Sequence, residues 1–599
     1  MVPSSRTVPK YGGMLPTDTK RDCSVTVTTN QSASAPLQLA KAAWVIRSPV
    51  AYALILLFGL ALCLPGFRTI PAVDRDEARF AQSTRQMHES GDYLNIRFQD
   101  EARLKKPVGI YWLQAAATSL AGGEDPDNPV WTYRLPSLVG ALGAILLTLF
   151  LGRRWMGPEA GFLAAAMFGA TLLLGVEARQ AKTDAFLLLT VLGAISGLAE
   201  AWMKAGSVQP LSRAVWISFW AALGIGILIK GPVILLVVGL TATVLTIHDR
   251  KTAWLKRLRP WPGVAITLAI ALPWVVAITI ASHGAFLTQS LGTDMASKLA
   301  GGQEAHGAPP GTYLALFPIT FWPASLFALM ALPWIWRSWR DRSVFFCLAW
   351  VLPSWIVFEI VPTKLPHYVL PLYPAIALLT AGYLADRLVA VPENAGWRRL
   401  LSRAPLLIWS LVGIGLGVTL AAAAPFGDGR PSIRGILAAL ALWALTGAGV
   451  WLLWRGTNPR EARLRTLAAT LVGAIIAWGF CFGAALPALE APWVAPRVKE
   501  AIFEKLPAGH GPVEFAGYRE PSAVIAFGTG TRFGDGGDAA RLLAAEVGAV
   551  AIVSEDELAS FNAGLTQNHL ATETLAVVSG FNYAKGKRVR LTIYRRQPQ

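Results

Sequence analysis

Charged residues are scarce in this chain. Asp, Glu, Lys and Arg make up 15% of its 599 residues, whereas hydrophobic types, aromatics included, make up 54%. A soluble protein of this length is about one-quarter charged, so the composition excludes an ordinary soluble enzyme. Cysteine is also rare. The four cysteines form no CxxC pair, so neither a zinc ribbon nor a disulfide framework is indicated.

What the sequence has instead is a succession of long apolar runs. Runs of this length can cross about 30 Å of hydrocarbon as helices. We predict an all-α polytopic membrane domain over residues 41–488, with about thirteen transmembrane helices. The predicted spans are 48–67, 132–151, 160–176, 184–203, 214–229, 231–247, 261–281, 312–336, 343–360, 368–385, 405–425, 433–454 and 463–488.

The Lys and Arg residues are concentrated in every second loop between these runs. "DRKTAWLKRLR" (249–259) is typical of loops that remain in the cytoplasm. Membrane topology therefore explains most of the net charge of +17, and we expect no nucleic-acid partner. Residues 1–40 are rich in Ser, Thr and Pro and are predicted to form a disordered cytoplasmic tail.

After residue 488 the pattern changes to short alternating strands and helices. This predicts a small α/β domain over residues 489–599, on the periplasmic side. The glycine-rich stretch 527–538 is interpreted as a surface loop and not as a phosphate loop. The predicted strands are 513–517, 523–527, 549–554 and 588–594, and the predicted helices are 538–548 and 555–564.

One outer loop, 68–131, breaks the charge rule. Eight basic residues lie between 68 and 108, where the topology predicts few, and a group of cations at the outer membrane face suits an anionic lipid head group. Residues 74–91 are predicted to form a helix with Asp74 as N-cap and Gly91 as stop. Residues 108–123 are predicted to form a juxtamembrane helix along the bilayer. The alternative reading of the acids at 74–77 is helix capping and complementation of the helix dipole.

Two further charged clusters are predicted on the same side of the membrane. Arg179, Lys182 and Asp184 form the first, and Lys364, His367 and Tyr368 form the second. Charged groups from separate spans that face one compartment suggest a shared cavity. The alternative for each cluster alone is long side chains that extend from helix ends to the interface. "LIKGPVIL" (228–235) is predicted to be a tight turn whose Lys230 faces the same cavity.

Four motifs then resemble a known family. "DEARFA" (76–81), "KKPVGIYWLQA" (105–115), "ARQAKTD" (178–184) and "KLPHYVLPLYP" (364–374) are similar to motifs of the bacterial relatives of protein O-mannosyltransferases. The nearest branch is the lipid A aminoarabinose transferases. These are GT-C glycosyltransferases, and the resemblance runs in order from about residue 48 to 390.

The resemblance implies an inverting transferase in the bacterial inner membrane. It would take a sugar from a polyprenyl (undecaprenyl) phosphate donor and transfer it to lipid A, lipopolysaccharide core or another envelope glycan on the periplasmic face. A monomer with a cytoplasmic N-terminus is expected. The implied catalytic residues are Asp76, Glu77 and Asp184, and the implied donor-phosphate ligands are Lys106, Arg79, Lys105, Lys182, Lys364 and Tyr368.

Two departures from the family pattern concern a metal. Lys105 stands where relatives carry a Glu that contributes to a metal site in some members, and "DMASK" (294–298) replaces a motif that has His and Arg. We therefore assign no metal or other cofactor; His306 and His367 are the remaining candidate ligands.

Two other functions stay open on the sequence. A protein acceptor, as in O-mannosylation, is the alternative within the same enzyme class. The alternative from another class is a transporter or flippase of lipid-linked sugars, for which charges near the midplane, broken helices and internal repeats would be expected.

Overall fold

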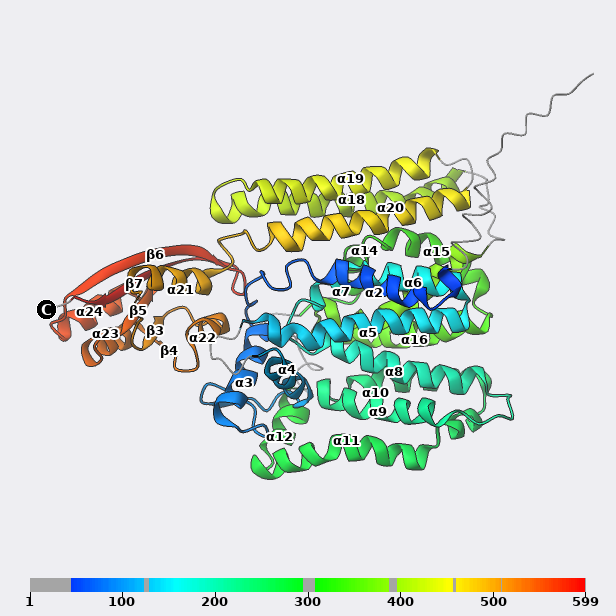
Figure 1. Ribbon diagram of the computed structural model, residues 1–599, viewed down its shortest axis with the longest axis horizontal. Helices are drawn as coiled ribbons and strands as arrows, with labels where there is room; N and C mark the ends of the chain where they lie inside the picture. Colours follow the sequence, from blue (N-terminus) through cyan, green and yellow to red (C-terminus); the bar gives the residue numbers. More distant parts are fainter. Residues whose placement is uncertain are drawn as a thin grey trace, which may run out of the picture. The chain divides into compact units, whose positions relative to one another are not determined.

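The membrane body and a C-terminal sheet domain make up the described chain (Figure 1). The computed structural model describes residues 45–122, 129–294, 307–386, 396–455, 459–507 and 509–597. The predicted tail 1–40 lies outside the described residues, as do His306, Met295 and Lys298.

Within the described ranges, nine helical segments are long and apolar enough to cross a membrane. Two of them join two elements each: Pro366–Ala385 comprises η3 (Pro366–Leu372) and α17 (Tyr373–Ala385), and Arg460–Ala485 comprises most of α20 (Pro459–Phe480) and η4 (Cys481–Ala485). The others are α5 (Trp131–Trp155), α8 (Asp184–Met203), α9 (Arg213–Lys230), α11 (Pro260–Ala281), α16 (Arg342–Ile360), α18 (Gly396–Asp428) and α19 (Ile433–Arg455).

The four other predicted spans correspond to shorter or interrupted helices. These are α2 (Val50–Cys63), α6 (Pro158–Gly169) followed by α7 (Leu172–Glu177), α10 (Val233–Asp249), and α14 (Thr312–Thr320) followed by α15 (Ser325–Ser338). The helical polytopic fold is thus confirmed; among the described residues, nine of the predicted spans are full-length helices and the other four are shorter or interrupted. Three short elements complete the body: η1 (Ala253–Leu258), α12 (Ala285–Leu287) and η2 (Thr288–Asp294).

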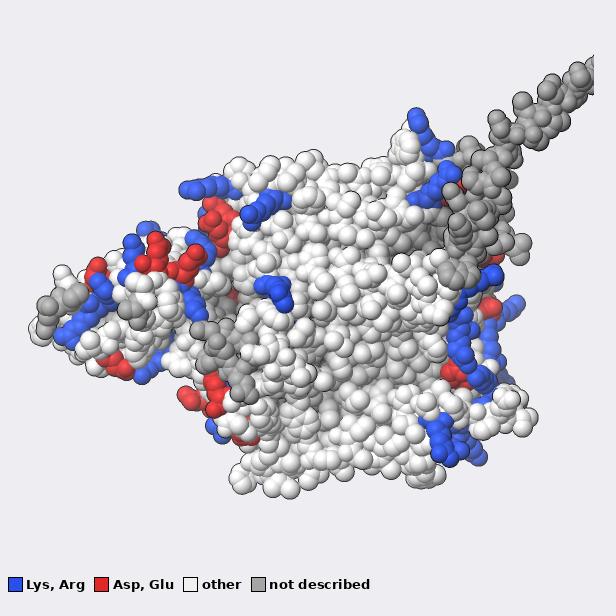
Figure 2. All heavy atoms as spheres, viewed as in Figure 1, with Lys and Arg blue, Asp and Glu red and all other residues white. Residues whose placement is uncertain are grey.

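The surface of the body is apolar between two charged ends. On the face shown in Figure 2, Lys and Arg gather at the end where α5 and α8 end and α16 begins, and a broad band beside it is almost free of charge. Such a band matches the hydrocarbon region of a bilayer. Helix α8 is mostly buried and α11 is mostly exposed, so α8 lies inside the bundle and α11 at its periphery.

Residues 68–122 fold into two helices joined by a small hairpin. Helix α3 (Asp76–Ser90) ends at Gly91, whose φ of 70° is the left-handed conformation that favours glycine, as predicted. Strands β1 (Arg97–Phe98) and β2 (Glu101–Ala102) pair antiparallel and lead into α4 (Gly109–Leu120). Helix α4 is too short to cross a bilayer.

The C-terminal domain is built on a mixed five-stranded sheet in the order β4-β3-β5-β7-β6. Strands β4 (Arg532–Gly534), β3 (Val513–Ala516) and β5 (Val550–Ser554) are parallel, and β7 (Lys587–Arg596) joins β5 and β6 (Thr572–Asn582) antiparallel. Its helices are α21 (Val494–Lys505), α22 (Pro521–Phe527), α23 (Gly536–Ala545), η5 (Glu555–Glu557) and α24 (Leu558–Gln567).

Three sequence predictions for this domain need correction. Residues 523–527, predicted as a strand, belong to helix α22, which begins at Pro521 and ends before Gly528 with φ 90°. A five-residue apolar run has no period long enough to separate strand from helix, and the proline and glycine at its borders were the better signal. Strands β6 and β4 were missed, and β4 lies inside the stretch interpreted as a glycine-rich loop.

Candidate active site

Asp76 is the first residue of α3. The residue before it, Arg75, has φ 68° and ψ −106°, so the chain turns sharply into the helix. The prediction that Asp74 caps this helix is wrong: the N-cap is Arg75, without a side-chain cap, and the Asp74 carboxylate accepts a hydrogen bond from Ser522 N at 2.8 Å. Asp76 remains open to solvent.

The Asp76 carboxylate lies in a strongly positive field. Desolvation by the surrounding protein raises its pKa, but Arg103, Lys182 and Lys106 outweigh this and hold the pKa below its usual range. The carboxylate is therefore ionised near neutral pH, as a base or a stabiliser of positive charge must be. Arg103 is oriented by a hydrogen bond from its Nε to the Tyr111 hydroxyl at 3.0 Å and by the Phe80 ring beneath it.

A second set of charges lies where α7, α8, α9 and η3 meet. Lys182 Nζ is 2.9 Å from Glu177 Oε1, and it donates a hydrogen bond to His367 Nδ1 at 3.3 Å. The Lys230 ammonium forms an ion pair with Asp184 and lies over the Tyr368 ring. Glu177, Lys182, Asp184 and His367 are buried, and Lys230 is nearly so.

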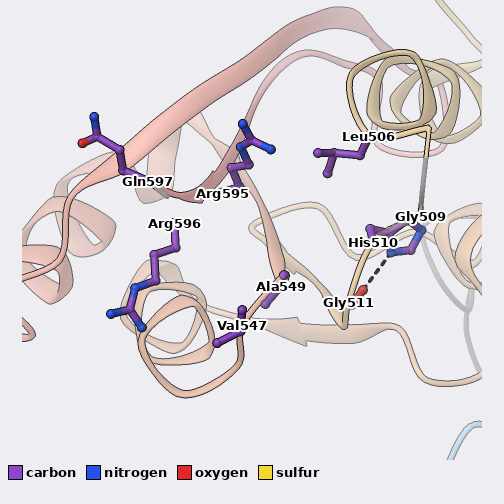
Figure 3. Close-up of a pocket in the computed structure, with 10 residues that line it drawn as sticks. Leu506, Gly509, His510, Gly511, Val547, Ala549, Arg595, Arg596 and Gln597 are labelled. Carbon is purple, nitrogen blue, oxygen red and sulfur yellow. Dashed lines mark hydrogen bonds between the residues drawn. The ribbon is translucent and has the colours of Figure 1, made fainter. Parts of the chain in front are cut away.

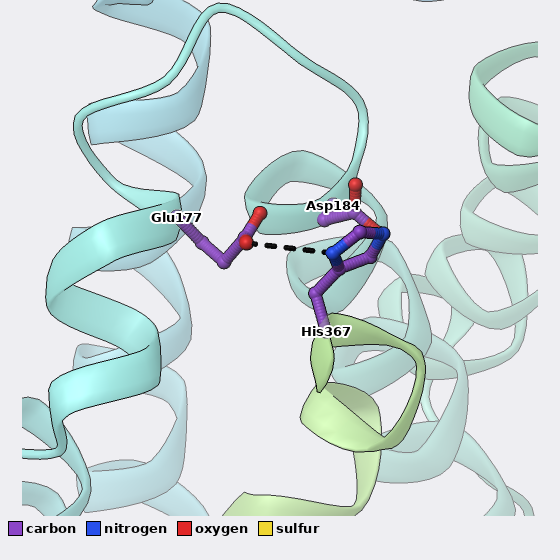
Figure 4. Close-up of side chains that lie close together, drawn as sticks. All are labelled: Glu177, Asp184 and His367. Atoms are coloured by element: carbon purple, nitrogen blue, oxygen red, sulfur yellow. Dashed lines mark ion pairs between the residues drawn. The ribbon is translucent and has the colours of Figure 1, made fainter. Parts of the chain in front are cut away.

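His367 lies between the two acids of this set, as Figure 4 shows. Its Nδ1 is 3.7 Å from Glu177 Oε1 and its Nε2 is 3.8 Å from Asp184 Oδ1. Because Lys182 donates to Nδ1, the ring proton of the neutral imidazole belongs on Nε2, facing Asp184.

Lys182 links this set to Asp76. Burial lowers the pKa of its ammonium, but Glu177, Asp184 and Asp76 together raise it above the usual value. The Lys182 ammonium therefore interacts with two of the predicted catalytic residues, Asp76 and Asp184. Three segments that lie far apart in the sequence thus contribute to one cluster of charges, while the shared cavity remains a prediction.

Glu77, in contrast, is occupied by structural contacts. Its carboxylate binds Arg134 through two hydrogen bonds, Nε to Oε1 at 2.8 Å and Nη2 to Oε2 at 3.0 Å, and both side chains are buried. It also accepts hydrogen bonds from Val73 N and Ala181 N, both at 2.8 Å. With these four donors it joins α3 to α5 and to the 178–183 segment, so we do not place Glu77 among the reacting groups.

The remaining predicted ligands are spread over the site. Lys364 is buried and donates to its own loop at Val361 O, at 2.6 Å. Arg79 interacts electrostatically with Asp74, Lys105 is exposed, and Lys106 is half-buried. Arg179 donates to the backbone oxygens of Pro65, Gly175 and Leu62, which makes it a structural residue.

Sequence reasoning missed Glu177, Arg103 and Arg134. Glu177 directly precedes "ARQAKTD", and Arg103 precedes "LKK", so proximity to the motifs was a usable signal for both. Arg134 lies near the start of the predicted span 132–151, and no nearby residue in the sequence indicated a partner for its guanidinium.

Glu177, Asp184 and His367 offer three ligand atoms within 4.8 Å of one another. Two carboxylates and an imidazole would suit a transition-metal ion. Here, however, the ammonium groups of Lys182 and Lys230 already pair with the two carboxylates. A divalent cation would have to displace them, so this arrangement does not fit a resident metal.

A separate cavity of about 640 Å³ lies in the C-terminal domain (Figure 3). His510 and Arg595 line it, but His510 is hydrogen-bonded to Gly511 O at 2.7 Å and Arg595 is paired with Glu573 at 2.7 Å. Its polar groups do not converge on a common point, so it is not the candidate site.

Several known proteins are similar to this chain. Residues 105–276 match a family described as dolichyl-phosphate-mannose-protein mannosyltransferase. An undecaprenyl phosphate-alpha-4-amino-4-deoxy-L-arabinose arabinosyl transferase of Pseudomonas fluorescens is 27% identical over 343 residues, which cover 56% of this chain and 60% of that protein. A transferase of the same description from Yersinia pestis is 26% identical over 397 residues, 62% of this chain and 66% of its own length.

The match to these curated relatives thus spans about 60 to 66% of their length. The crystal structure of ArnT from Cupriavidus metallidurans bound to undecaprenyl phosphate superposes with a TM-score of 0.67 at 19% identity, covering 92% of this chain and 98% of that one. This chain therefore has the GT-C fold of ArnT, and its predicted resemblance to the lipid A aminoarabinose transferases is confirmed.

Proposed function

We propose that this chain is an inverting glycosyltransferase that uses a polyprenyl phosphate-linked sugar. The acceptor is lipid A, lipopolysaccharide core or another envelope glycan, at the periplasmic face of the inner membrane. One observation carries the proposal: the Asp76 carboxylate lies in the combined positive field of Arg103, Lys182 and Lys106, and the apolar span α8 begins two residues after Lys182. A sugar joined to a lipid phosphate needs a carboxylate near its C1, cations at its phosphate and an apolar path for its tail.

The chemistry follows from these residue types. The acceptor oxygen attacks C1 of the sugar on the face opposite the phosphate, and the bond from C1 to the phosphate oxygen breaks. Its electron pair leaves with polyprenyl phosphate, whose growing negative charge Lys106, Arg103 and Lys182 stabilise. Asp184 and Glu177 hold Lys182 and Lys230 in place through their ion pairs.

The role of Asp76 depends on the acceptor. A hydroxyl acceptor must lose its proton, and the ionised Asp76 carboxylate can take it as general base. A phosphate monoester is already largely ionised at pH 7, since its second pKa is near 6. For that acceptor Asp76 stabilises the positive charge that develops on the sugar.

Mass spectrometry tests this function directly. Lipid A, core oligosaccharide and glycoproteins are compared from cells with and without the gene. Loss of one sugar increment from lipid A or core supports the proposal and identifies the sugar. Loss confined to glycoproteins would instead favour a protein acceptor. Loss of a flippase would remove the same increment, so the purified protein must also transfer the sugar in vitro; movement of the lipid-linked sugar across a vesicle membrane without transfer would favour a flippase.

The topology is part of the proposal and has its own test. Val547 is exposed in the C-terminal domain and Lys251 is exposed in the loop after α10. In a Cys23→Ser background, whose other cysteines are buried, a membrane-impermeant maleimide should label Val547→Cys from the periplasm. Lys251→Cys should react only after the membrane is permeabilised; the reverse pattern would invert the topology.

A further inference from the structure

The turn that precedes Asp76 has an unusual backbone. Arg75 combines φ 68° with ψ −106°, a region that glycine enters freely and that side-chain-bearing residues rarely adopt. Such a conformation persists only when surrounding contacts impose it. The carboxylate of Asp76 follows directly, so whatever imposes the turn also sets the position of that carboxylate.

Three contacts to this turn come from the C-terminal domain, in addition to the hydrogen bond that Val73 N donates to Glu77 Oε2. The Tyr583 hydroxyl accepts a hydrogen bond from Asp74 N at 2.6 Å, and the Asp74 carboxylate accepts one from Ser522 N at 2.8 Å. The Arg75 guanidinium donates to Ala584 O. These partners lie more than 440 residues further along the chain than the turn they hold.

The contact region is itself ordered by buried polar groups. Asn582 donates to Glu520 Oε1 at 2.7 Å, which joins the segment that carries Tyr583 to the segment that carries Ser522. Asp74, Ser522, Glu520 and Asn582 are all buried. Buried polar groups that satisfy one another specify a single arrangement, so this region holds the turn rigidly.

The domain holds α3 at a second place, farther from Asp76. The Thr529 hydroxyl contacts Gln82 Nε2 at 2.6 Å and Glu89 Oε2 at 2.7 Å. Arg85 Nη1 donates to Ile525 O at 3.2 Å. General docking of the domain and restraint of the turn can therefore be separated experimentally.

We propose that the C-terminal domain is a positioning element of the active site. Tyr583 and Ser522 hold the turn at Arg75 and so fix the carboxylate of Asp76 against its cations. The inference rests on the proposed function, because it gives Asp76 a role in transfer. In general, displacement of a reacting group by about 1 Å can cost about a hundredfold in rate without loss of binding.

Two variants of the full-length protein in nanodiscs test this proposal. Tyr583→Phe removes one hydrogen-bond acceptor, and Asp74→Ala removes the other. We expect each to lower kcat by about tenfold or more, while the KM for the polyprenyl phosphate-linked sugar changes by less than about twofold. Asp74→Asn retains an acceptor oxygen for Ser522 N and should keep kcat close to the wild-type value.

Thr529→Val is the matched control, since it breaks contacts between the domain and α3 away from the turn. It should leave kcat within about twofold of the wild type. A loss of kcat equal to that of Tyr583→Phe would mean that docking alone matters. Unchanged kcat in both Tyr583→Phe and Asp74→Ala would also overturn the proposal.

Hydrogen–deuterium exchange provides a readout that needs no substrate. Amides of peptide 73–79, which excludes the Gln82 contact of Thr529, should exchange faster in Tyr583→Phe and Asp74→Ala than in Thr529→Val, whose exchange should match the wild type there. If the wild type shows no transfer activity, the proposed function fails while this measurement still decides the restraint. Equal exchange in all variants would disprove the restraint even if transfer is observed.

Discussion

Arg134 Nε lies 2.8 Å from Glu77 Oε1, in an ion pair that the protein buries between α3 and α5. Arg134 also donates to Phe67 O, Ile70 O and Pro71 O, at 2.8 to 3.0 Å. The pair thus ties the chain segment before α3 to the membrane body. Glu77 therefore has a structural role, whereas its neighbour Asp76 is proposed to act in transfer.

Arg134→Met should therefore destabilise the protein strongly. It leaves the Glu77 carboxylate buried without its cation, which typically costs about 3–5 kcal/mol. Thermal unfolding in detergent measures the effect, and adding Glu77→Leu should recover part of the loss because no unpaired charge remains. Unfolding of Arg134→Met at the wild-type temperature would contradict the structural role.

Asp76→Asn should have the opposite profile. The change is nearly isosteric, so thermal unfolding should stay as in the wild type. Sugar transfer should fall by about two to four orders of magnitude, the usual range for loss of a catalytic acid–base group. Transfer assays with purified protein decide this, and near-normal activity would remove Asp76 from the mechanism.

Lys106→Ala should weaken donor binding. A hydrogen bond to a charged group contributes about 1.5–3 kcal/mol, so the KM for the lipid-linked donor should rise by about tenfold or more. The adjacent Lys105 is also a predicted ligand but is exposed, so Lys105→Ala, with the same loss of charge, should raise this KM less. A raised KM for the acceptor alone would argue against a phosphate contact at Lys106.

Asp74 should make stability depend on pH. Burial raises its pKa from 3.8 to about 6, although hydrogen bonds from Ser522 and the charge of Arg79 oppose the shift and Glu520 adds to it. Because the folded-state pKa is raised, the stabilisation is complete below about pH 4 and is lost as the pH rises towards 6.

Asp74→Asn should abolish this dependence. The variant should unfold at a higher temperature than the wild type at pH 8 and at a similar temperature near pH 4, with a difference of up to about 2–3 kcal/mol. Thermal unfolding across this range measures it. Identical pH profiles for both proteins would show that Asp74 does not titrate in this way.

Chelation should leave the proposed sugar transfer intact. Lys182 and Lys230 neutralise Glu177 and Asp184, so the cluster needs no divalent cation for charge balance. Transfer after dialysis against EDTA should stay within about twofold of the untreated value. Loss of activity that Mn²⁺ or Zn²⁺ restores would show that a metal displaces the ammonium groups.

The local sequence pattern determined the fold class of this protein and the helix that begins with Asp76. The length of the apolar runs and the alternation of basic loops predict a polytopic helical protein, because spanning a bilayer depends on each segment alone. Helix α3 and its stop at Gly91 follow from residues within one short stretch. The four motifs, read in order, predict the GT-C fold and the group of charges around Asp76 and Asp184.

Only the tertiary structure decided which charges meet. Three pairings depend on groups from distant segments. Asp74 contacts Ser522 instead of capping α3, Lys230 pairs with Asp184, and Glu77 pairs with Arg134. A buried charge takes whichever partner the packing of helices brings within reach. Neither hydrophobic period nor residue spacing contains that information, because contacts across hundreds of residues arise only when the helices and the C-terminal sheet have packed together.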